Sequence, residues 1–488
     1  MKHLKNGTDI RGIAIGENKN LTPEIASRLG RAFAAYLLEQ GATAPLTIAV
    51  GRDPRLSGQG LKDGLVEGLC AMGAKVLDCG LATTPSMFFA TYFEGSDAAG
   101  AIEITASHLP YDRNGLKFFT KEGGIDGKVI SRLIELAEEN AFEEQPGGSV
   151  AAFDLMAPYS ESLVRLVREK TGQMRPLEGI GIAVDAGNGA GGFFVEKVLK
   201  PMGAKTEGSV FLEPDGSFPN HIPNPENAAA MAACAKATVD AGAELGICFD
   251  TDCDRSAIVA ADGTEINRNR MIAMIGALML RENPGCTIVT DSVTSKGLAA
   301  FIEERGGIHH RFMRGYKKVI DEAIRLEKSG ICAPLAMETS GHGALKENHY
   351  LDDGSYLVAR LLAELALLKK EGKSLLSLID GLQEPKDSLE LRADIRDEDF
   401  KAYGAKVLEA LSAHCKEMGW EEVSPNYEGV RVNFGKESGN GWFLVRMSLH
   451  DPVIPINIES DTEGGAKVIA DQLYDFLDKF DALSLPTY

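Results

Sequence analysis

The sequence lacks the features that mark membrane, exported or nucleic-acid-binding proteins. No stretch approaches the roughly 18 uninterrupted apolar residues of a membrane span, and the first residues, MKHLKNGTDIRG, lack the apolar segment of a signal peptide. With 51 Lys and Arg against 71 Asp and Glu, the formal net charge of −20 would be repelled by nucleic acid and by anionic lipid. We therefore expect a cytoplasmic protein with no nucleic-acid partner and no membrane partner.

Cysteine is also sparse, with 8 scattered residues in 488. Cys248 and Cys253 form the closest useful pair, and no further Cys or His lies at the spacing of a zinc site. We expect these cysteines to be reduced thiols.

Three segments repeat one pattern of strand, polar loop, helix and strand. They begin at residues 47–53, 181–185 and 286–291, and they continue to glycine-led segments at 73–77, 203–205 and 306–307. Buried apolar strands that alternate with helices are typical of α/β domains with parallel or mixed sheets. A length of 488 residues leaves room for roughly three or four such domains.

The last part of the chain has a different rhythm. Alternating segments at 389–395, 427–434 and 442–449 predict strands, and 400–415 and 465–480 predict helices, which is typical of a smaller α+β domain with an antiparallel sheet. Pro- and Gly-containing stretches suggest the boundaries between domains. The predicted domains are residues 1–148, 149–262, 263–384 and 385–488.

Residues 104–117 (ITASHLPYDRNGLK) place a hydroxyl, an imidazole and an ammonium group in a loop after an apolar segment. Ser107 beside His108, with Lys117 ten residues later, could be a nucleophile that a base activates. The same pattern also fits a polar turn punctuated by Pro110 and Gly115. The loop alone does not decide between these interpretations.

Three carboxylates at alternate positions follow the apolar strand 246–249: Asp250, Asp252 and Asp254. Like charges so close raise one another's pKa unless a cation neutralises them, and ligands that are all oxygen favour Mg²⁺. Arg255 could hold a phosphate beside the metal. The alternatives are an Asp-rich turn and, because of the Asp-x-Asp pattern, an aspartyl nucleophile of the haloacid-dehalogenase-type phosphatases.

A third polar group follows the apolar segment 331–336. Glu338, Ser340 and His342 surround Gly341, and carboxylates of this kind accept paired sugar hydroxyls. A helix cap with a nearby histidine is an equal alternative for this segment alone.

Taken together in this order, the motifs resemble the α-D-phosphohexomutase family, which includes the phosphomannomutase/phosphoglucomutase enzymes. Residues 105–110 with Lys117 match its phosphoserine loop, 250–255 its Mg²⁺ loop and 338–342 its sugar-recognition loop. In the family, Asn is usual at Leu109 and Gly at Thr251 and Cys253. Supporting matches lie at 7–12, 51–58, 185–189 and 214–226.

The last domain departs from the family pattern. The phosphate-binding loop usually reads Arg-x-Ser-Gly-Thr-Glu-Pro, whereas residues 446–452 read RMSLHDP. Arg446 and Ser448 remain as an anchor for phosphate, while Leu449 replaces a glycine that lets backbone amides approach the phosphate. His450 could donate to a phosphate when protonated, or could simply be a surface histidine.

The resemblance implies three related α/β domains with mixed sheets and a smaller α+β C-terminal domain, arranged around a central cleft. It implies an isomerase of carbohydrate metabolism, a phosphomutase that interconverts the 1- and 6-phosphates of mannose or glucose. The reaction would pass through a phosphoserine and a hexose 1,6-bisphosphate. The implied cofactors are Mg²⁺ and hexose 1,6-bisphosphate as activator, and the small-molecule partner is a hexose phosphate.

The residue roles that the resemblance implies fall into three groups. The predicted catalytic residues are Ser107, His108, Lys117 and Arg11. The predicted metal ligands are Ser107, Asp250, Asp252 and Asp254. The predicted substrate-binding residues are Glu338, Ser340, His342, Arg255, Arg446 and Ser448. Phosphoglucosamine mutase is the close alternative, and the altered last loop also permits a non-catalytic paralogue that binds sugar phosphates.

Overall fold

The computed structural model describes residues 1–448 and 451–488, so the predicted change at Leu449 and His450 lies outside the described residues. The chain forms two compact units. The first consists of Met1–Met271 and Ser340–Leu378, and the second of Ile272–Thr339 and Ile379–Tyr488. None of the helices in the described ranges has both the length and the apolar character that crossing a membrane requires.

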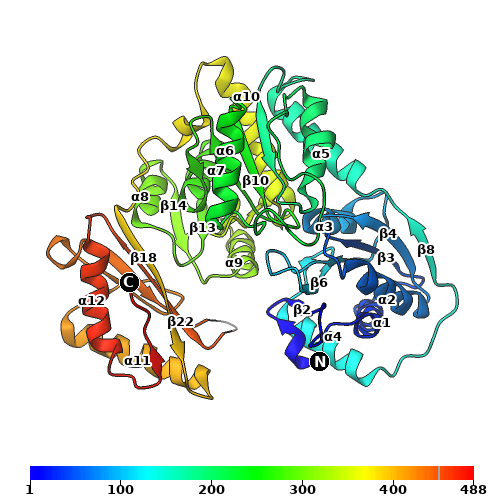
Figure 1. The fold of residues 1–488 in the computed structure, drawn as a ribbon, viewed down its shortest axis with the longest axis horizontal. Coiled ribbons are helices and arrows are strands. Elements are labelled where there is room, and N and C mark those ends of the chain that lie inside the picture. The colour runs from blue at the N-terminus through cyan, green and yellow to red at the C-terminus, as the bar shows by residue number, and fades with distance from the viewer. Residues whose placement is uncertain (449–450) are drawn as a thin grey trace. The chain divides into compact units, whose positions relative to one another are not determined.

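The N-terminal part of the first unit is built on an eight-stranded mixed sheet (Figure 1). Its order is β1-β2-β6-β5-β3-β4-β8, with β7 paired to β6; β3 runs parallel to β4 and β5, whereas β6 runs antiparallel to β5. Its strands are β1 (Lys5–Asn6), β2 (Asp9–Ile13), β3 (Thr47–Arg52), β4 (Lys75–Leu81), β5 (Gly100–Ile104), β6 (Arg113–Thr120), β7 (Gly123–Gly124) and β8 (Ser149–Ala152).

Four helices accompany this sheet: α1 (Pro23–Glu39), α2 (Gly58–Ala71), α3 (Thr84–Tyr92) and α4 (Gly127–Glu139). Helix α1 begins where Thr22 accepts a hydrogen bond from the amide of Ile25, with Pro23 at the first helical position. The leucines at 61, 65 and 69 are buried on one face of α2, as the helical spacing predicted.

A second, four-stranded sheet in the first unit has the order β12-β11-β10-β9. Its strands are β9 (Ile182–Asp185), β10 (Leu245–Phe249), β11 (Ser256–Ala260) and β12 (Glu265–Ile266). The remaining elements are α5 (Met156–Thr171), a π-helix (Phe194–Leu199), α6 (Ala228–Asp240), the hairpin strands β16 (Gly343–Leu345) and β17 (Leu351–Asp352), and α10 (Gly354–Lys370).

One predicted strand is wrong. The described segment that begins at Gly203 forms no continuous strand and makes only isolated parallel bridges, from Lys205 to Gly181 and from Val210 to Asp185. The parallel neighbour of β9 is instead β10, which follows α6. The glycine-led segment thus follows one edge of β9 without forming a strand, while β10 pairs with the other edge.

The second unit contains a three-stranded parallel arrangement in the order β14-β13-β15. These strands are β13 (Thr287–Thr290), β14 (Ile308–Arg311) and β15 (Leu335–Met337), and the helices are α8 (Lys296–Glu304) and α9 (Tyr316–Lys328). Helix α7 (Arg268–Glu282) begins in the first unit and ends in the second.

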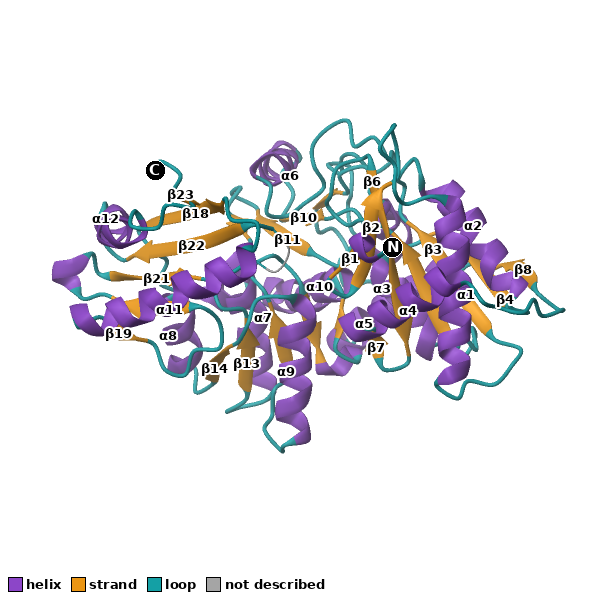
Figure 2. Ribbon diagram, turned by 90° about the horizontal axis from the view of Figure 1, so that it is seen from below, coloured by secondary structure: helices purple, strands orange, loops and turns teal. Residues whose placement is uncertain are grey.

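The C-terminal part of the second unit is the predicted α+β domain with an antiparallel sheet (Figure 2). The strand order is β19-β20-β21-β22-β18-β23, and residues of α11 and α12 form one apolar core with alternate residues of β18 and β21. The elements are β18 (Asp387–Ile395), α11 (Phe400–Met418), β19 (Glu421–Glu422), β20 (Val430–Asn433), β21 (Gly441–Val445), β22 (Val453–Ser460), α12 (Gly465–Leu477) and β23 (Leu483–Ser484).

Candidate functional site

Ser107 lies in the loop that joins the antiparallel strands β5 and β6. The pairing of Ile104 with Leu116 brings the two ends of this loop together. Ser107 is buried and has φ +52°, a left-handed conformation that costs a residue with a side chain of the order of 1–2 kcal/mol. Its amide donates to Thr105 Oγ1 at 2.8 Å. The surrounding structure therefore holds Ser107 in a conformation that the chain would not adopt alone.

The guanidinium group of Arg55 holds the loop in place. Its nitrogens donate to the carbonyl oxygens of Leu109 and Pro110, each at 2.6 Å, and to that of Ser107. Arg55 also pairs with Asp53 at 3.1 Å, and both side chains are fully buried. One side chain thus satisfies several loop carbonyls while a buried carboxylate offsets its charge.

The acidic residues lie in the loop that joins β10 to β11 in the antiparallel pairing of Phe249 with Ser256. Cys253 has φ +61° in this loop, which explains physically why glycine suits that position. The three aspartates offer carboxylate oxygens that all lie within 4.8 Å of one another.

The two loops meet at the hydroxyl group of Ser107. The Oγ of Ser107 donates to Asp250 Oδ2 at 3.3 Å, and Arg255 Nη2 donates to the same Oγ at 3.2 Å. Arg255 Nε pairs with Asp250 Oδ2 at 3.1 Å. The structure therefore brings the predicted phosphoserine position, a predicted metal ligand and the predicted phosphate-binding arginine into direct contact.

Lys117, on β6, supplies positive charge to the other two aspartates. Its Nζ lies 2.9 Å from Asp252 Oδ2 and 2.5 Å from Asp254 Oδ2. The hydroxyl of Thr84, at the start of α3, donates to Asp252 Oδ2 at 2.5 Å. Sequence reasoning gave no role to Thr84, which is 168 residues from Asp252 in the chain.

The pKa values of two carboxyls in this cluster are shifted in opposite directions. Burial, with the neighbouring Asp254 and Asp252, raises the pKa of Asp250 well above its usual value. Burial also acts to raise the pKa of Asp254, but Lys117, His342 and Arg255 outweigh it and lower that pKa. Among the described residues, Asp252 Oδ1 and Asp254 Oδ1 are buried without a hydrogen-bond partner. A cation bound by oxygen ligands would satisfy both oxygens and relieve the repulsion.

His108 is held as a neutral imidazole. Its Nδ1 accepts a hydrogen bond from Arg255 Nη2 at 2.6 Å and lies 3.3 Å from Ser107 Oγ. Burial, reinforced by Arg255 and Arg11, lowers the pKa of His108 to about 2. Arg11 pairs with Asp9 at 2.9 Å and donates to the Ala106 carbonyl at 3.4 Å, so it lies beside the Ser107 loop.

Ser340 and His342 of the predicted sugar loop also belong to the first unit. His342 forms an antiparallel bridge with Arg255, and its Nδ1 lies 3.4 Å from Asp352 Oδ2. His342, Asp254 and Asp352 form a second group whose ligand atoms are close enough to share a metal ion. Ser340 Oγ is buried and has no hydrogen-bond partner within the described ranges.

Glu338, Arg446 and Ser448 belong to the second unit. Glu338 Oε1 accepts the amide of Gly315 at 2.6 Å. Ser448 Oγ accepts the amide of Asp451 at 3.2 Å. Burial lowers the pKa of Arg446, and nearby Glu428 opposes that effect.

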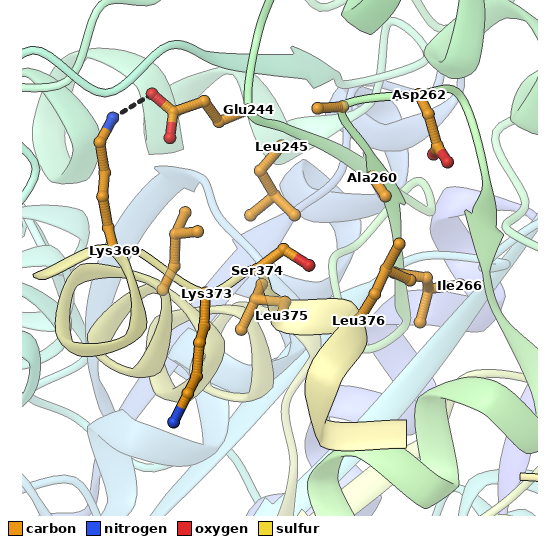
Figure 3. Close-up of a pocket in the computed structure, with 12 residues that line it drawn as sticks. Glu244, Leu245, Ala260, Asp262, Ile266, Lys369, Lys373, Ser374, Leu375 and Leu376 are labelled. Carbon is orange, nitrogen blue, oxygen red and sulfur yellow. Dashed lines mark hydrogen bonds and ion pairs between the residues drawn. The ribbon is translucent and has the colours of Figure 1, made fainter. Parts of the chain in front are cut away.

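A cavity of about 310 Å³ in the first unit contains none of the predicted site residues (Figure 3). Leu245, Leu375 and Ile266 line it, and an ion pair between Lys369 and Glu244 lies at its margin. Lys373, Ser374 and Asp262 also line the cavity, but none of the residues of the predicted motifs lies there, so the site around Ser107 remains the candidate.

The fold and site define a class: α/β proteins in which a buried serine hydroxyl lies beside a carboxylate group suited to a cation. Three family models match the chain, for the α/β/α domains I, II and III of phosphoglucomutase/phosphomannomutase, at residues 2–144, 157–263 and 267–385. The chain belongs to the phosphoglucomutase/phosphomannomutase family of α-D-phosphohexomutases, which confirms the predicted resemblance and fold class.

Relatives match along nearly the whole chain. A phosphoglucomutase of Neisseria gonorrhoeae is 34% identical over 463 residues, covering 94% of each chain. A phosphomannomutase/phosphoglucomutase of Pseudomonas aeruginosa strain PAO1 is 31% identical over 462 residues, covering 93% of this chain and 91% of its own. The crystal structure of a phosphoglucomutase/phosphomannomutase family protein from Burkholderia thailandensis is 30% identical, with a TM-score of 0.83 and 100% of each chain covered.

Proposed function

We propose that this protein is a phosphohexomutase that interconverts the 1- and 6-phosphates of glucose or mannose through phosphorylated Ser107 and a hexose 1,6-bisphosphate. The contact of Ser107 Oγ with both Asp250 and Arg255 carries this proposal, because a phosphoryl group there would meet a cation site and a guanidinium group. The names of the relatives, which cover both sugars, support the same activity.

The residues of the acidic loop fit Mg²⁺ as the metal. Asp250, Asp252 and Asp254 would hold it together with a phosphoserine oxygen on Ser107, and two of the carboxylates have buried oxygens without hydrogen-bond partners in the described structure. An all-oxygen ligand set suits a hard cation. When bound, Mg²⁺ would neutralise negative charge on the phosphoryl group.

The chemistry requires the substrate hydroxyl to attack phosphorus, forming an O–P bond as the bond from phosphorus to Ser107 Oγ breaks. Arg255 and Arg11, which flank the loop, would stabilise the charge of the moving phosphoryl group. Lys117 and His108 remain the candidates for moving the proton of the hydroxyl.

The substrate contacts of this proposal come from the predicted groups. Glu338, Ser340 and His342 would bind sugar hydroxyls, while Arg446 and Ser448 would bind the phosphate that is not being transferred. We propose the four domains with the predicted boundaries, 1–148, 149–262, 263–384 and 385–488. Hexose 1,6-bisphosphate would act as activator by phosphorylating unmodified Ser107.

Intact-mass measurement and a coupled assay test the proposal together. The purified protein should contain a phosphorylated fraction that is absent in Ser107→Ala and retained in Ser57→Ala, a control serine whose hydroxyl accepts from Asn114 at 2.9 Å. With Mg²⁺ and glucose 1,6-bisphosphate supplied, the protein should isomerise glucose 1-phosphate or mannose 1-phosphate. If neither a phosphorylated form nor isomerisation is found, the mutase proposal is wrong.

The alternatives give different results in the same assays. Preferential turnover of glucosamine 6-phosphate would indicate a phosphoglucosamine mutase. Binding of hexose phosphates without turnover would indicate a non-catalytic paralogue.

A further inference from the structure

Among the described residues, Arg446 has no short hydrogen bond or ion pair to another side chain. It follows β21, its Nε is buried without a hydrogen-bond partner among the described residues, and its Nη1 reaches only the Met447 carbonyl at 3.5 Å. An anion that accepts hydrogen bonds from such a guanidinium group would stabilise it. Arg446 alone supplies one positive charge, whereas a phosphate monoester carries about −1.5 to −2 at neutral pH.

The segment between β14 and α9 brings a second arginine to the same place. The amide of Arg314 donates to Glu428 Oε2 at 3.0 Å, and Ser292 also donates to this oxygen. Glu428 precedes Gly429, where an added Cβ would lie 2.9 Å from the Cβ of Arg446. The backbone of Arg314 is therefore tied to a carboxylate that lies beside Arg446.

The electrostatics agree with this placement. The charge of Arg314 acts on Arg446, lowering its pKa, and it is the main influence that opposes the effect of burial on the pKa of Asp291. The next residue, Gly315, donates its amide to Glu338, the carboxylate predicted to bind sugar hydroxyls. One short segment thus connects the sugar loop with the predicted phosphate anchor.

We propose that Arg314 is a second phosphate-binding residue, so that Arg314 and Arg446 together hold the phosphate that is not being transferred. This inference rests on the proposed function, because it concerns the same hexose phosphate. Two guanidinium groups match the charge and the several oxygens of a phosphate better than they match a singly charged carboxylate. Arg314 would also supply a contact that does not depend on the altered residues 449–450.

Binding of glucose 6-phosphate, measured by isothermal titration calorimetry on the full chain, tests the inference. All variants carry Ser107→Ala, so that phosphoryl transfer cannot contribute to the signal. Arg314→Gln and Arg446→Gln should each weaken binding by about 10- to 100-fold, the effect of losing hydrogen bonds to a charged group. Arg314→Lys keeps the positive charge but loses the planar guanidinium group, so it should bind more tightly than Arg314→Gln and more weakly than the parent protein.

Lys328→Gln is the matched control, because it removes one positive charge at the opposite end of α9. It should leave the dissociation constant within about twofold, and thermal melting of each variant checks that it is folded. If Arg446→Gln weakens binding and Arg314→Gln does not, the inference is wrong while the proposed phosphate anchor survives. If neither variant weakens binding, both the inference and the proposed location of the phosphate are wrong.

Discussion

Glu103 provides a sharp test of the physical reasoning, because the described structure buries its carboxyl group without giving it a hydrogen bond. It lies on β5, is 0% exposed, and neither carboxyl oxygen has a hydrogen-bond partner among the described residues. An added Cβ at Gly51 would lie 2.7 Å from Glu103 Oε2 and 2.5 Å from Met87 Sδ, so the carboxyl is closely packed. Lys117 is its cross-strand partner in the register, but the ammonium group of that residue contacts Asp252 and Asp254.

Replacing Glu103 with Met should stabilise the protein. A buried polar group without a partner costs about 1–3 kcal/mol, and Met can fill a similar volume without that cost. Burial, with Asp53 and Asp252 nearby, raises the pKa of Glu103 well above 4.5, so the folded protein holds this proton at a pH where the unfolded chain has released it. The wild-type protein should therefore lose stability as pH rises above about 4.5, by up to 1.4 kcal/mol per pH unit.

Urea unfolding of the wild type, Glu103→Met and Glu103→Gln at pH 6.0 and pH 7.0 measures this effect. The stability difference between Glu103→Met and the wild type should grow between the two pH values, by up to about 1.4 kcal/mol. Glu103→Gln is polar but cannot titrate, so its difference from Glu103→Met should not change with pH. A wild-type difference that is independent of pH, or a destabilised Glu103→Met, would refute the reasoning.

Three further results are expected. Arg55→Leu should lower the free energy of unfolding in urea by about 3–5 kcal/mol, because it leaves Asp53 buried without its partner. Arg55→Lys should lower it less but should still reduce the phosphorylated fraction measured by intact mass. Chelation with EDTA should abolish isomerisation, added Mg²⁺ should restore it, and Asp254→Asn should prevent the restoration; activity that survives chelation would contradict the metal site. Burial raises the pKa of Glu459 to about 7 despite nearby Arg431, so Glu459 should contribute a loss of stability as pH rises from about 4.5 through 7. The loss between pH 5 and pH 8 in urea unfolding should therefore be smaller for Glu459→Gln than for the wild type.

The sequence predicted the fold well where local pattern and burial agree. The apolar run before Asp250 forms β10, and the leucines at helical spacing lie in α2, because each element buries one continuous set of side chains. The prediction failed at Gly203, because the segment there meets β9 only at isolated bridges, whereas β10, which follows α6, pairs with β9 continuously. Which strand occupies a position in a sheet depends on long-range pairing, and a repeated local rhythm does not encode that choice.

The candidate site was partly predictable for a similar reason. The acidic loop and Ser107 carry recognisable side chains at fixed spacing, so their types indicated a cation and a nucleophile before any geometry was known. Thr84 and Glu103 could not be found in this way. Thr84 looks like an ordinary helix-start residue, and Glu103 is one acidic residue within an apolar strand. Only the folded structure shows that Thr84 contacts Asp252 and that Glu103 lies opposite Lys117.

Arg55 and Arg314 show a more general limit of reading motifs. The match at residues 51–58 included Arg55, but its main partners are backbone carbonyl oxygens, which have no signature in a sequence. Arg314 is likewise held by a hydrogen bond from its backbone amide to Glu428, which lies 114 positions later in the sequence. A side chain that acts through backbone atoms is therefore recognised only once the fold is known. If Arg314 binds phosphate as proposed, a chain with an altered sequence at 449–450 can keep phosphate binding without keeping the motif.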